Sequence, residues 1–264
     1  SITDLFKAGI IPGLAMGVAL MIVCYIMAKK YGFKGETKKF SFKAVVKSFV
    51  DAIWALLSPV IILGGIYSGI FTPTEAAVVS VVYALLVGLF IYKELNLKTL
   101  YAKFADAACT HGTVNIIVGT STILGRVLTL EQIPDMVATS MLSLTDNKIV
   151  MLMIINVLLL ACGCLLETNS SILILAPILY PVVANFGVDI VHFGLIMVVN
   201  LAIGFITPPV GVNLFVACGI GNIPFAQLVK KIIPFLLVLL LGLLIITYIP
   251  AVSLTIPRLL GYAG

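Results

Sequence analysis

Residues 204–213 read Gly-Phe-Ile-Thr-Pro-Pro-Val-Gly-Val-Asn and interrupt a long apolar run. Proline lacks a backbone N–H and clashes with the preceding helical turn, so Pro208 and Pro209 predict that a helix breaks here. The apolar residues on both sides indicate a break at mid-membrane. The carbonyl groups released by the break, from Gly204 to Thr207, must then line a cavity or meet a cation, because lipid cannot hydrogen-bond them.

A proline kink with only a structural role is the alternative, and a single proline would favour it. Here Gly204 and Gly211 bracket two prolines, and Thr207 and Asn213 add polar groups. The C-terminal end of a half-helix attracts cations, and its N-terminal end attracts carboxylates. The combination therefore favours a binding site.

A second polar interruption, Glu-Thr-Asn-Ser-Ser at residues 167–171, separates two further apolar runs. Both runs are short, and the polar segment offers many oxygens. We expect a re-entrant helical hairpin over about 149–186 whose tip stops inside the protein. An ordinary short turn outside the membrane, capped by Thr168 and Asn169, is the alternative.

The composition of the chain, with 264 residues of which 61% are hydrophobic and 10% charged, excludes an ordinary soluble domain. A membrane-spanning helix needs about 20 apolar residues. Four runs approach that length: Ala8–Ala28, Ala76–Tyr92, Ile149–Leu166 and Ile232–Ile249. Four are shorter or broken by Gly and Pro: Trp54–Phe71, Ala107–Leu124, Ile172–Phe186 and Phe193–Cys218. Strand-type alternation is absent, so we predict an all-α polytopic membrane protein.

The lysines cluster beside the apolar runs, which predicts their side of the membrane. The clusters are Lys29, Lys30, Lys34, Lys38, Lys39, Lys43 and Lys47, then Lys93, Lys98 and Lys103, and finally Lys230 and Lys231. Excess lysine marks cytoplasmic loops. A nucleic-acid surface would need such charges on a folded face with stacking aromatics, so we expect membrane lipid and no nucleic acid as a partner. Phe40–Trp54, basic and then apolar, fits an interfacial helix.

Other functional classes lack their usual side chains. The five cysteines lie in apolar runs, and Cys162-Gly163-Cys164 lacks the spacer of a zinc or redox pair. His111 and His192 lie far apart, and Glu167 has no acidic partner at catalytic spacing, so we predict no enzyme. A channel would need a continuous polar lining, whereas the polar residues here cluster at the two interruptions. We expect caps at helix starts from the Thr72–Glu75 segment and from Asp189.

The two ends of the chain echo each other. Ile10–Leu14 and Ile232–Leu236 share four of five residues. The first helix ends in lysines and the last begins after lysines, so equivalent helices would point in opposite directions, which is typical of inverted repeats in secondary transporters. We expect the first helix to end one repeat whose earlier part precedes Ser1, so that these residues alone would not transport.

Residues 64–77, Gly-Gly-Ile-Tyr-Ser-Gly-Ile-Phe-Thr-Pro-Thr-Glu-Ala-Ala, and the stretch from His192 to Phe215 resemble the large membrane subunit of tripartite ATP-independent periplasmic (TRAP) transporters. The resemblance covers essentially the whole chain. It implies an elevator-type fold of the ion-transporter superfamily, with a re-entrant hairpin and a broken helix in each of two inverted repeats.

The same resemblance implies a function. A protein of the bacterial inner (cytoplasmic) membrane would import a small organic anion, such as a C4-dicarboxylate or sialic acid, together with Na⁺. A periplasmic substrate-binding protein would deliver the anion, and a small membrane subunit would complete the transporter. A sodium-coupled anion transporter of the same superfamily that needs no binding protein is the alternative.

By position, the resemblance implies one sodium site and half of the substrate site. The expected substrate-binding residues are Glu167, Thr168, Asn169, Ser170, Ser171, Pro209 and Asn213. The expected sodium ligands are Thr168, Asn169, Gly204, Thr207, Pro208 and Gly211. Relatives often carry Asp where this chain has Glu167. Since both breaks belong at one depth, we expect Ser170 and Ser171 to lie near Thr207 and Pro208.

The implied organisation has five segments. They are the last helix of the first repeat (1–30), a basic cytoplasmic or interfacial segment (31–53), scaffold helices (54–106), a transport part with the hairpin and the broken helix at about 192–218 (107–230), and a final scaffold helix (231–264).

The lysine pattern makes a testable prediction of topology. Reporter fusions after Lys47 and after Lys103 should report the cytoplasm, and a fusion after Gly264 should report the periplasm. A cytoplasmic signal at residue 264 would contradict the inverted-repeat interpretation.

Overall fold

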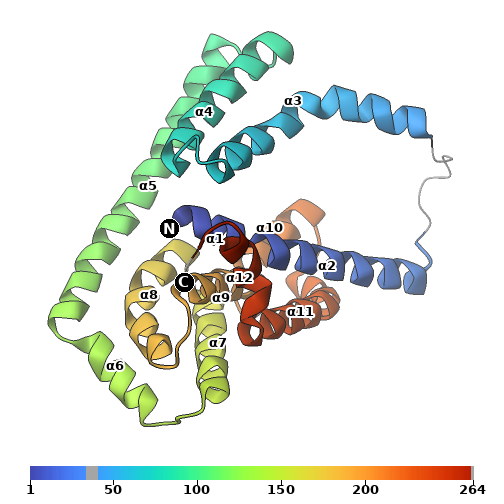
Figure 1. Cartoon of the computed structure of the whole chain (residues 1–264). Helices are drawn as coiled ribbons and strands as arrows, with labels where there is room; N and C mark the ends of the chain where they lie inside the picture. The colour runs from blue at the N-terminus through green and yellow to red at the C-terminus, as the bar shows by residue number, and fades with distance from the viewer. Residues whose placement is uncertain (34–40, 263–264) are drawn as a thin grey trace. The chain divides into compact units, whose positions relative to one another are not determined.

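The computed structural model describes residues 1–33 and 41–262, and the regular elements within these ranges are all helices (Figure 1). They are α1 (Ile2–Ala8), α2 (Ile10–Tyr31), α3 (Phe42–Tyr67), α4 (Pro73–Leu86), η1 (Val87–Ile91), α5 (Leu97–Leu130), α6 (Ile133–Leu142), α7 (Lys148–Leu165), α8 (Thr168–Asn185), α9 (Ile190–Gly204), α10 (Val212–Gly221), α11 (Phe225–Tyr248) and α12 (Pro250–Leu259). The all-α prediction is confirmed. Lys34, Lys38, Lys39 and Gly264 lie outside the described residues.

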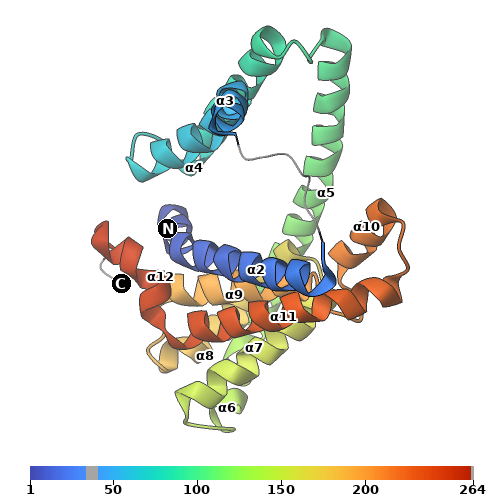
Figure 2. The ribbon, with the colours of Figure 1, turned by 90° about the vertical axis from the view of Figure 1, so that its right-hand side faces the viewer.

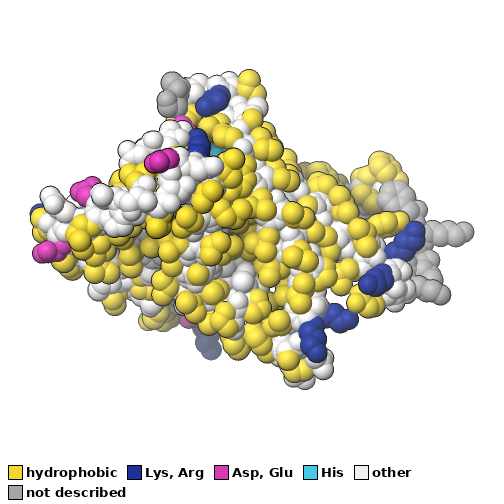
Figure 3. Space-filling model, turned by 90° about the horizontal axis from the view of Figure 1, so that it is seen from below, with side chains coloured by type: hydrophobic (Ala, Val, Ile, Leu, Met, Phe, Trp, Pro, Cys, Tyr) yellow, Lys and Arg dark blue, Asp and Glu magenta, His cyan; other side chains and the backbone are white. Residues whose placement is uncertain are grey.

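Within residues 1–33 and 41–262, seven helical stretches are long and apolar enough to cross a membrane. They are Ile2–Tyr31, Phe42–Tyr67, Pro73–Ile91, Leu97–Leu130, Lys148–Leu165, Thr168–Asn185 and Phe225–Tyr248. Helices α9 and α10 are apolar but shorter. Hydrophobic side chains dominate the surface seen in Figure 3, with Lys and Arg gathered in a few places. A surface of this kind suits lipid, so the chain is a multi-pass membrane protein.

The chain folds as two compact units. One contains Thr3–Gly32 and Val114–Gly264, and the other contains Phe33–Thr113. Helix α5 passes from one unit into the other.

The helix bounds differ from the expected segment boundaries. Helix α3 runs unbroken across the boundary at 53–54, because Ser41 caps its start and residues 42–58 contain no proline or glycine; Pro59 lies inside the helix beyond that boundary. The expected short interfacial helix is therefore the first part of a 26-residue helix. Helices α5 and α11 likewise cross the boundaries at 106–107 and 230–231. The assignment of segments to scaffold and transport parts stays a prediction.

In the unit of residues 33–113, the predicted cap of α4 is confirmed. The Glu75 carboxylate accepts from the backbone N–H of Thr72 at 2.8 Å, and the Thr72 hydroxyl accepts from the N–H of Glu75 at 3.3 Å. Just before this capping box, the Phe71 ring packs on Gly65, where an added Cβ would lie 2.4 Å from a ring carbon. Much of the stretch 64–77 thus specifies a tight connection between α3 and α4.

In the other unit, α2 and α11 pack side by side and run antiparallel (Figure 2). The Lys231 Nζ at the start of α11 lies 4.5 Å from the centroid of the Tyr31 ring at the end of α2. Farther along, a Cβ on Gly242 would lie 3.5 Å from Met16. The opposite directions agree with the lysine pattern.

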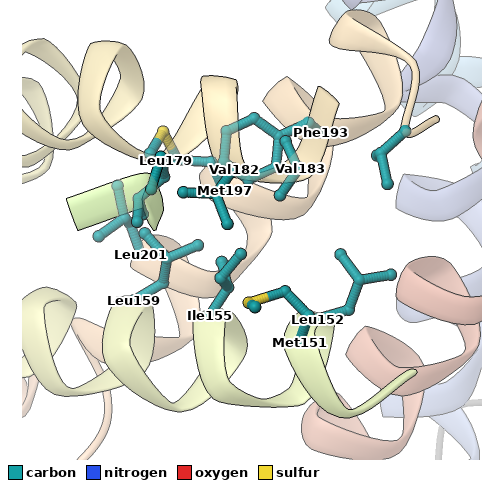
Figure 4. Close-up of a cluster of buried hydrophobic side chains, with 12 residues drawn as sticks. Met151, Leu152, Ile155, Leu159, Leu179, Val182, Val183, Phe193, Met197 and Leu201 are labelled. Atoms are coloured by element: carbon teal, nitrogen blue, oxygen red, sulfur yellow. The ribbon is translucent and has the colours of Figure 1, made fainter. Parts of the chain in front are cut away.

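The core of this unit lies between α7, α8 and α9 (Figure 4). Its most deeply buried side chains include Met151, Ile155, Leu159, Leu179, Val182, Val183 and Leu201. Helix α7 contributes residues 151, 155 and 159 to this core. They are four residues apart and therefore lie on one face of the helix.

We predict that Leu159→Ala lowers the free energy of unfolding by roughly 2–4 kcal/mol, because it leaves a cavity among close-packed side chains. Leu158→Ala on the same helix is the matched control, since Leu158 is 40% exposed whereas Leu159 is 0% exposed. Denaturant unfolding of the complete transporter in detergent measures both. Equal losses in the two variants would contradict the assignment of this core.

Candidate functional site

The structure contains the predicted helical hairpin. Helix α7 ends at Leu165 and α8 begins at Thr168, so only two residues connect them. The Glu167 carboxylate accepts from the backbone N–H of Ser170 at 3.0 Å, and the Ser171 hydroxyl donates to the Glu167 carbonyl at 2.9 Å. The depth of the tip in the membrane stays a prediction.

The residue that caps α8 is not one of those expected in the alternative interpretation, in which Thr168 and Asn169 cap an ordinary turn. Glu167 caps the helix, whereas Thr168 and Asn169 lie inside its first turn. One carboxylate oxygen, Oε2, makes the bonds to Ser170. The other oxygen accepts no hydrogen bond from the described residues, so Glu167 can cap the helix and still offer an acceptor at the tip.

The predicted break in the helix is also present. Helix α9 ends at Gly204 and α10 begins at Val212, after a connection that contains a cis Pro208–Pro209 peptide bond. The Thr207 hydroxyl donates to the Ile203 carbonyl at 2.7 Å, which ties the connection back to α9. Gly211, immediately before α10, has a φ of 55°, a backbone conformation that glycine adopts readily.

Only the later part of the expected stretch from Gly204 to Thr207 has free carbonyl groups. The Gly204 carbonyl accepts from the Thr207 N–H at 2.9 Å, and the Phe205 carbonyl accepts from the Asn213 N–H at 3.1 Å. These bonds form because the chain turns tightly after α9 and α10 folds back on it. Among the described residues, the carbonyls of Thr207 and Pro208 receive no hydrogen-bond donor. The expected release is therefore wrong for Gly204 and Phe205, whose carbonyls each accept a backbone hydrogen bond and keep one further lone pair.

Helices α7 and α9 meet backbone to backbone beside both breaks. A Cβ on Gly204 would lie 2.5 Å from the Gly163 carbonyl carbon and 2.9 Å from the Cys164 nitrogen. A Cβ on Gly163 would lie 3.0 Å from the Leu201 Cα. Small residues allow this close approach of membrane helices. The end of the first hairpin arm is thus fixed against the end of α9.

Sequence reasoning missed Gly163, which stood out only as the middle of Cys162-Gly163-Cys164. Gly163 and Gly204 each lie near the end of an apolar run, and this shared position was the signal in the sequence that could have indicated a close helix contact. The contact between α7 and α9 brings the hairpin and the broken helix together. The direct approach of Ser170 and Ser171 to Thr207 and Pro208 stays a prediction.

The remaining predicted site residues lie at the same two interruptions. Thr168 is half-buried, and the side chains of Asn169, Pro209 and Asn213 are exposed. Within the described ranges, the side chains of Thr168, Asn169 and Asn213 make no hydrogen bond, so their polar groups are free to meet a ligand. Their roles toward sodium or substrate stay predictions.

A buried polar network also joins four helices, and sequence reasoning did not find it. Asn200 on α9 donates to the Asn156 side chain on α7 at 2.7 Å, and Asn156 donates to Thr247 on α11 at 3.1 Å. The Thr247 carbonyl lies 3.3 Å from His192 Nε2, and His192 Nδ1 lies 2.6 Å from the Ser253 hydroxyl. Isolated polar residues within apolar runs were the signal that could have revealed it.

The expected cap at the start of α9 is confirmed. Asp189 caps the helix, because its Oδ1 accepts from the N–H groups of Val191 at 2.8 Å and of His192 at 3.1 Å. His192 is 2% exposed and bonded on both nitrogens, which is an interface role between helices.

Apart from the Glu167 carboxylate at the hairpin tip, the oxygens available at the two breaks are neutral. Within residues 1–33 and 41–262, no three His, Cys, Asp or Glu side chains gather as a metal-binding group. A cation at the hairpin tip or the broken helix would therefore be held by carbonyl, hydroxyl and amide oxygens, which suits a hard monovalent ion better than a divalent one.

A short helical hairpin beside a broken helix is an arrangement that secondary transporters use. Comparison with known families agrees. The family described as "Tripartite ATP-independent periplasmic transporter, DctM component" matches residues 1–252, and the chain belongs to it.

Several curated relatives are similar over nearly the whole chain. The isethionate TRAP transporter permease protein DctMQ of Oleidesulfovibrio alaskensis is 49% identical over 96% of this chain and 40% of its own length. The C4-dicarboxylate TRAP transporter large permease protein DctM of Pseudomonas aeruginosa is 42% identical, over 99% of this chain and 61% of its own length. The sialic acid TRAP transporter large permease protein SiaM of Vibrio cholerae is 41% identical, with the same coverage of 99% and 61%. The chain thus spans about half the length of these relatives. They are transporter permeases, which confirms the prediction that the chain is no enzyme.

The contact of Gly163 with Gly204 predicts that Gly204→Ala is disruptive. The methyl group must push α7 and α9 apart, at a cost of roughly 1–3 kcal/mol in the free energy of unfolding. Gly219→Ala on α10 is the control, because a Cβ there meets nothing within 4 Å. Denaturant unfolding of the complete transporter measures both variants. A free energy of unfolding equal to that of the parent protein in both would contradict the contact.

Proposed function

We propose that the chain supplies one half of the ion and substrate site of a sodium-coupled TRAP transporter in the bacterial inner membrane. The observation that carries this proposal is the approach of α7 to α9 at Gly163 and Gly204, directly before two interruptions rich in free oxygens. A family membership that covers residues 1–252 supports the transport class.

Sodium would bind where the broken helix ends. The carbonyls of Thr207 and Pro208 have no donor among the described residues, and the Thr207 hydroxyl oxygen keeps lone pairs after donating to Ile203. Oxygens from Thr168 and Asn169 at the start of α8 would complete the ligand set. The Gly204 carbonyl and the backbone at Gly211, the other expected sodium ligands, lie at the two ends of the same connection.

A bound sodium ion would attract an organic anion in two ways. It would order the hairpin tip and the broken helix, and it would supply the positive charge that the free polar groups here lack. The substrate would then contact Ser170, Ser171, Pro209 and Asn213, with Glu167 at the edge of the site. By thermodynamic linkage, sodium and substrate must raise each other's affinity by the same factor.

The substrate class follows from chemistry shared among the relatives' names. Isethionate, C4-dicarboxylates and sialic acid are small, hydroxylated or polyfunctional acids. Isethionate is a sulfonate, so we propose an organic acid in general as the substrate. A periplasmic binding protein would deliver it, and a small membrane subunit would complete the complex. Transport would proceed as an elevator, in which the hairpin and broken helix slide as one body.

Thr207→Val tests the sodium site. The nearly isosteric change removes one oxygen, whose net contribution of about 1 kcal/mol predicts about a fivefold rise in the sodium concentration for half-maximal uptake. Thr207→Ser retains the oxygen and is the control. The measurement is substrate uptake against sodium concentration by the complete transporter in proteoliposomes. An unchanged midpoint and Hill coefficient for Thr207→Val would remove this residue from the sodium site.

A further inference from the structure

A pocket with charged side chains in part of its lining lies where α7 and α9 begin and α11 ends. Its volume is about 350 Å³, and it is lined on its polar side by Lys148, Asp189, His192 and Arg258. All four helices that form it, α7, α9, α11 and α12, belong to one compact unit. It lies at the opposite end of α9 from the break, so it is separate from the proposed sodium site.

The pocket carries an excess of positive charge. Lys148 and Arg258 are exposed, and neither forms an ion pair with any described residue. The one carboxylate of the pocket is already engaged: Asp189 Oδ1 accepts from the backbone N–H groups of Val191 and His192, and its Oδ2 accepts from the Tyr262 hydroxyl at 3.0 Å. His192 is bonded on both ring nitrogens. Two cations therefore remain available for an anionic ligand.

An apolar groove continues from this pocket along α7. Its volume is about 430 Å³, and its lining consists of Ile149, Val150, Met153, Ile154, Val157 and Tyr248. Ile149 and Tyr248 line both cavities, and the Tyr248 hydroxyl donates to the Ile149 carbonyl at 3.0 Å at their boundary. The groove thus begins where the charged pocket ends.

The dimensions of the groove fit a lipid chain. Residues 149, 153 and 157 follow one face of α7 over about 12 Å, at a rise of about 1.5 Å per residue. One leaflet of a bilayer core is about 15 Å thick. Because α7 is a candidate membrane span that begins at Lys148, the charged pocket lies at the end of the span and the groove descends from it.

We propose that the pocket and groove together bind one anionic phospholipid. Its phosphate pairs with Lys148 and Arg258, and one acyl chain lies along α7 in the groove. A guanidinium group matches the geometry of a phosphate, and the two cations favour an anionic over a zwitterionic headgroup. Since α7 is the first arm of the hairpin, an ordered lipid here would stabilise that arm.

Lipid binding to the complete transporter tests the proposal. The purified transporter, with its small subunit, is titrated with phosphatidylglycerol or phosphatidylcholine of equal chain length, and bound lipid is counted by native mass spectrometry. Near a membrane surface each cation contributes about a fivefold gain in affinity for an anionic lipid. We expect the double variant Lys148→Gln/Arg258→Gln to lose about 25-fold in affinity for phosphatidylglycerol, with little change for phosphatidylcholine. Lys98→Gln/Lys103→Gln is the matched control on α5.

The groove is tested separately. Met153→Trp fills it and should abolish saturable binding of phosphatidylglycerol, whereas Met136→Trp on α6, at a site that is 61% exposed, should not. Three results would overturn the proposal. Equal binding of the two lipids would leave only an apolar groove, and equal competition by glycerol phosphate would leave only a soluble-anion site. Binding seen only after removal of the small subunit would assign the groove to that protein. Unchanged unfolding midpoints of the variants exclude misfolding as the cause.

Discussion

The closest approach of α7 to α9, at Gly163 and Gly204, is the contact on which the proposed site depends. Any side chain larger than hydrogen at Gly204 would collide with the backbone of α7. The contact lies just before the hairpin turn on one helix and just before the proline break on the other. Two interruptions that are far apart in sequence therefore start from a common point, as the proposed site requires.

Polar contacts reinforce this arrangement within the membrane. Lipid is as apolar as a leucine side chain, so close packing and hydrogen bonds, rather than hydrophobic burial, hold membrane helices together. The chain from Asn200 through Asn156 to Thr247 links α9, α7 and α11. The Asn200 Oδ1 is buried and lacks a donor among the described residues, so one acceptor of this network is unsatisfied. Helix α11, which we expected in the scaffold, is thereby tied to helices expected in the transport part. A sliding movement of α7 to α9 must either break these bonds or carry α11 with it.

The positions of both interruptions could be predicted from the sequence, because their causes are local. Pro208 and Pro209 cannot continue a helix, Glu167 and its polar neighbours break an apolar run, and Thr72 with Glu75 forms a capping box from four adjacent residues. The rest depends on contacts between distant residues. Nothing local shows that Gly163 faces Gly204, that Asn213 reaches back to the Phe205 carbonyl, or that Asn156 meets Thr247. Helix α3 is longer than expected because lysines near its start mark a membrane surface but do not end a helix.

The central claim is that the hairpin tip and the broken helix hold one sodium ion between them. An electron cryo-microscopy structure of the complete transporter, determined in sodium and again in potassium, tests this most directly. In sodium we expect density for an ion between the Thr207 carbonyl and the first turn of α8, and we expect that density to be lost in potassium. A hairpin tip lying away from Thr207, or ion density elsewhere with none at the break, would contradict the claim.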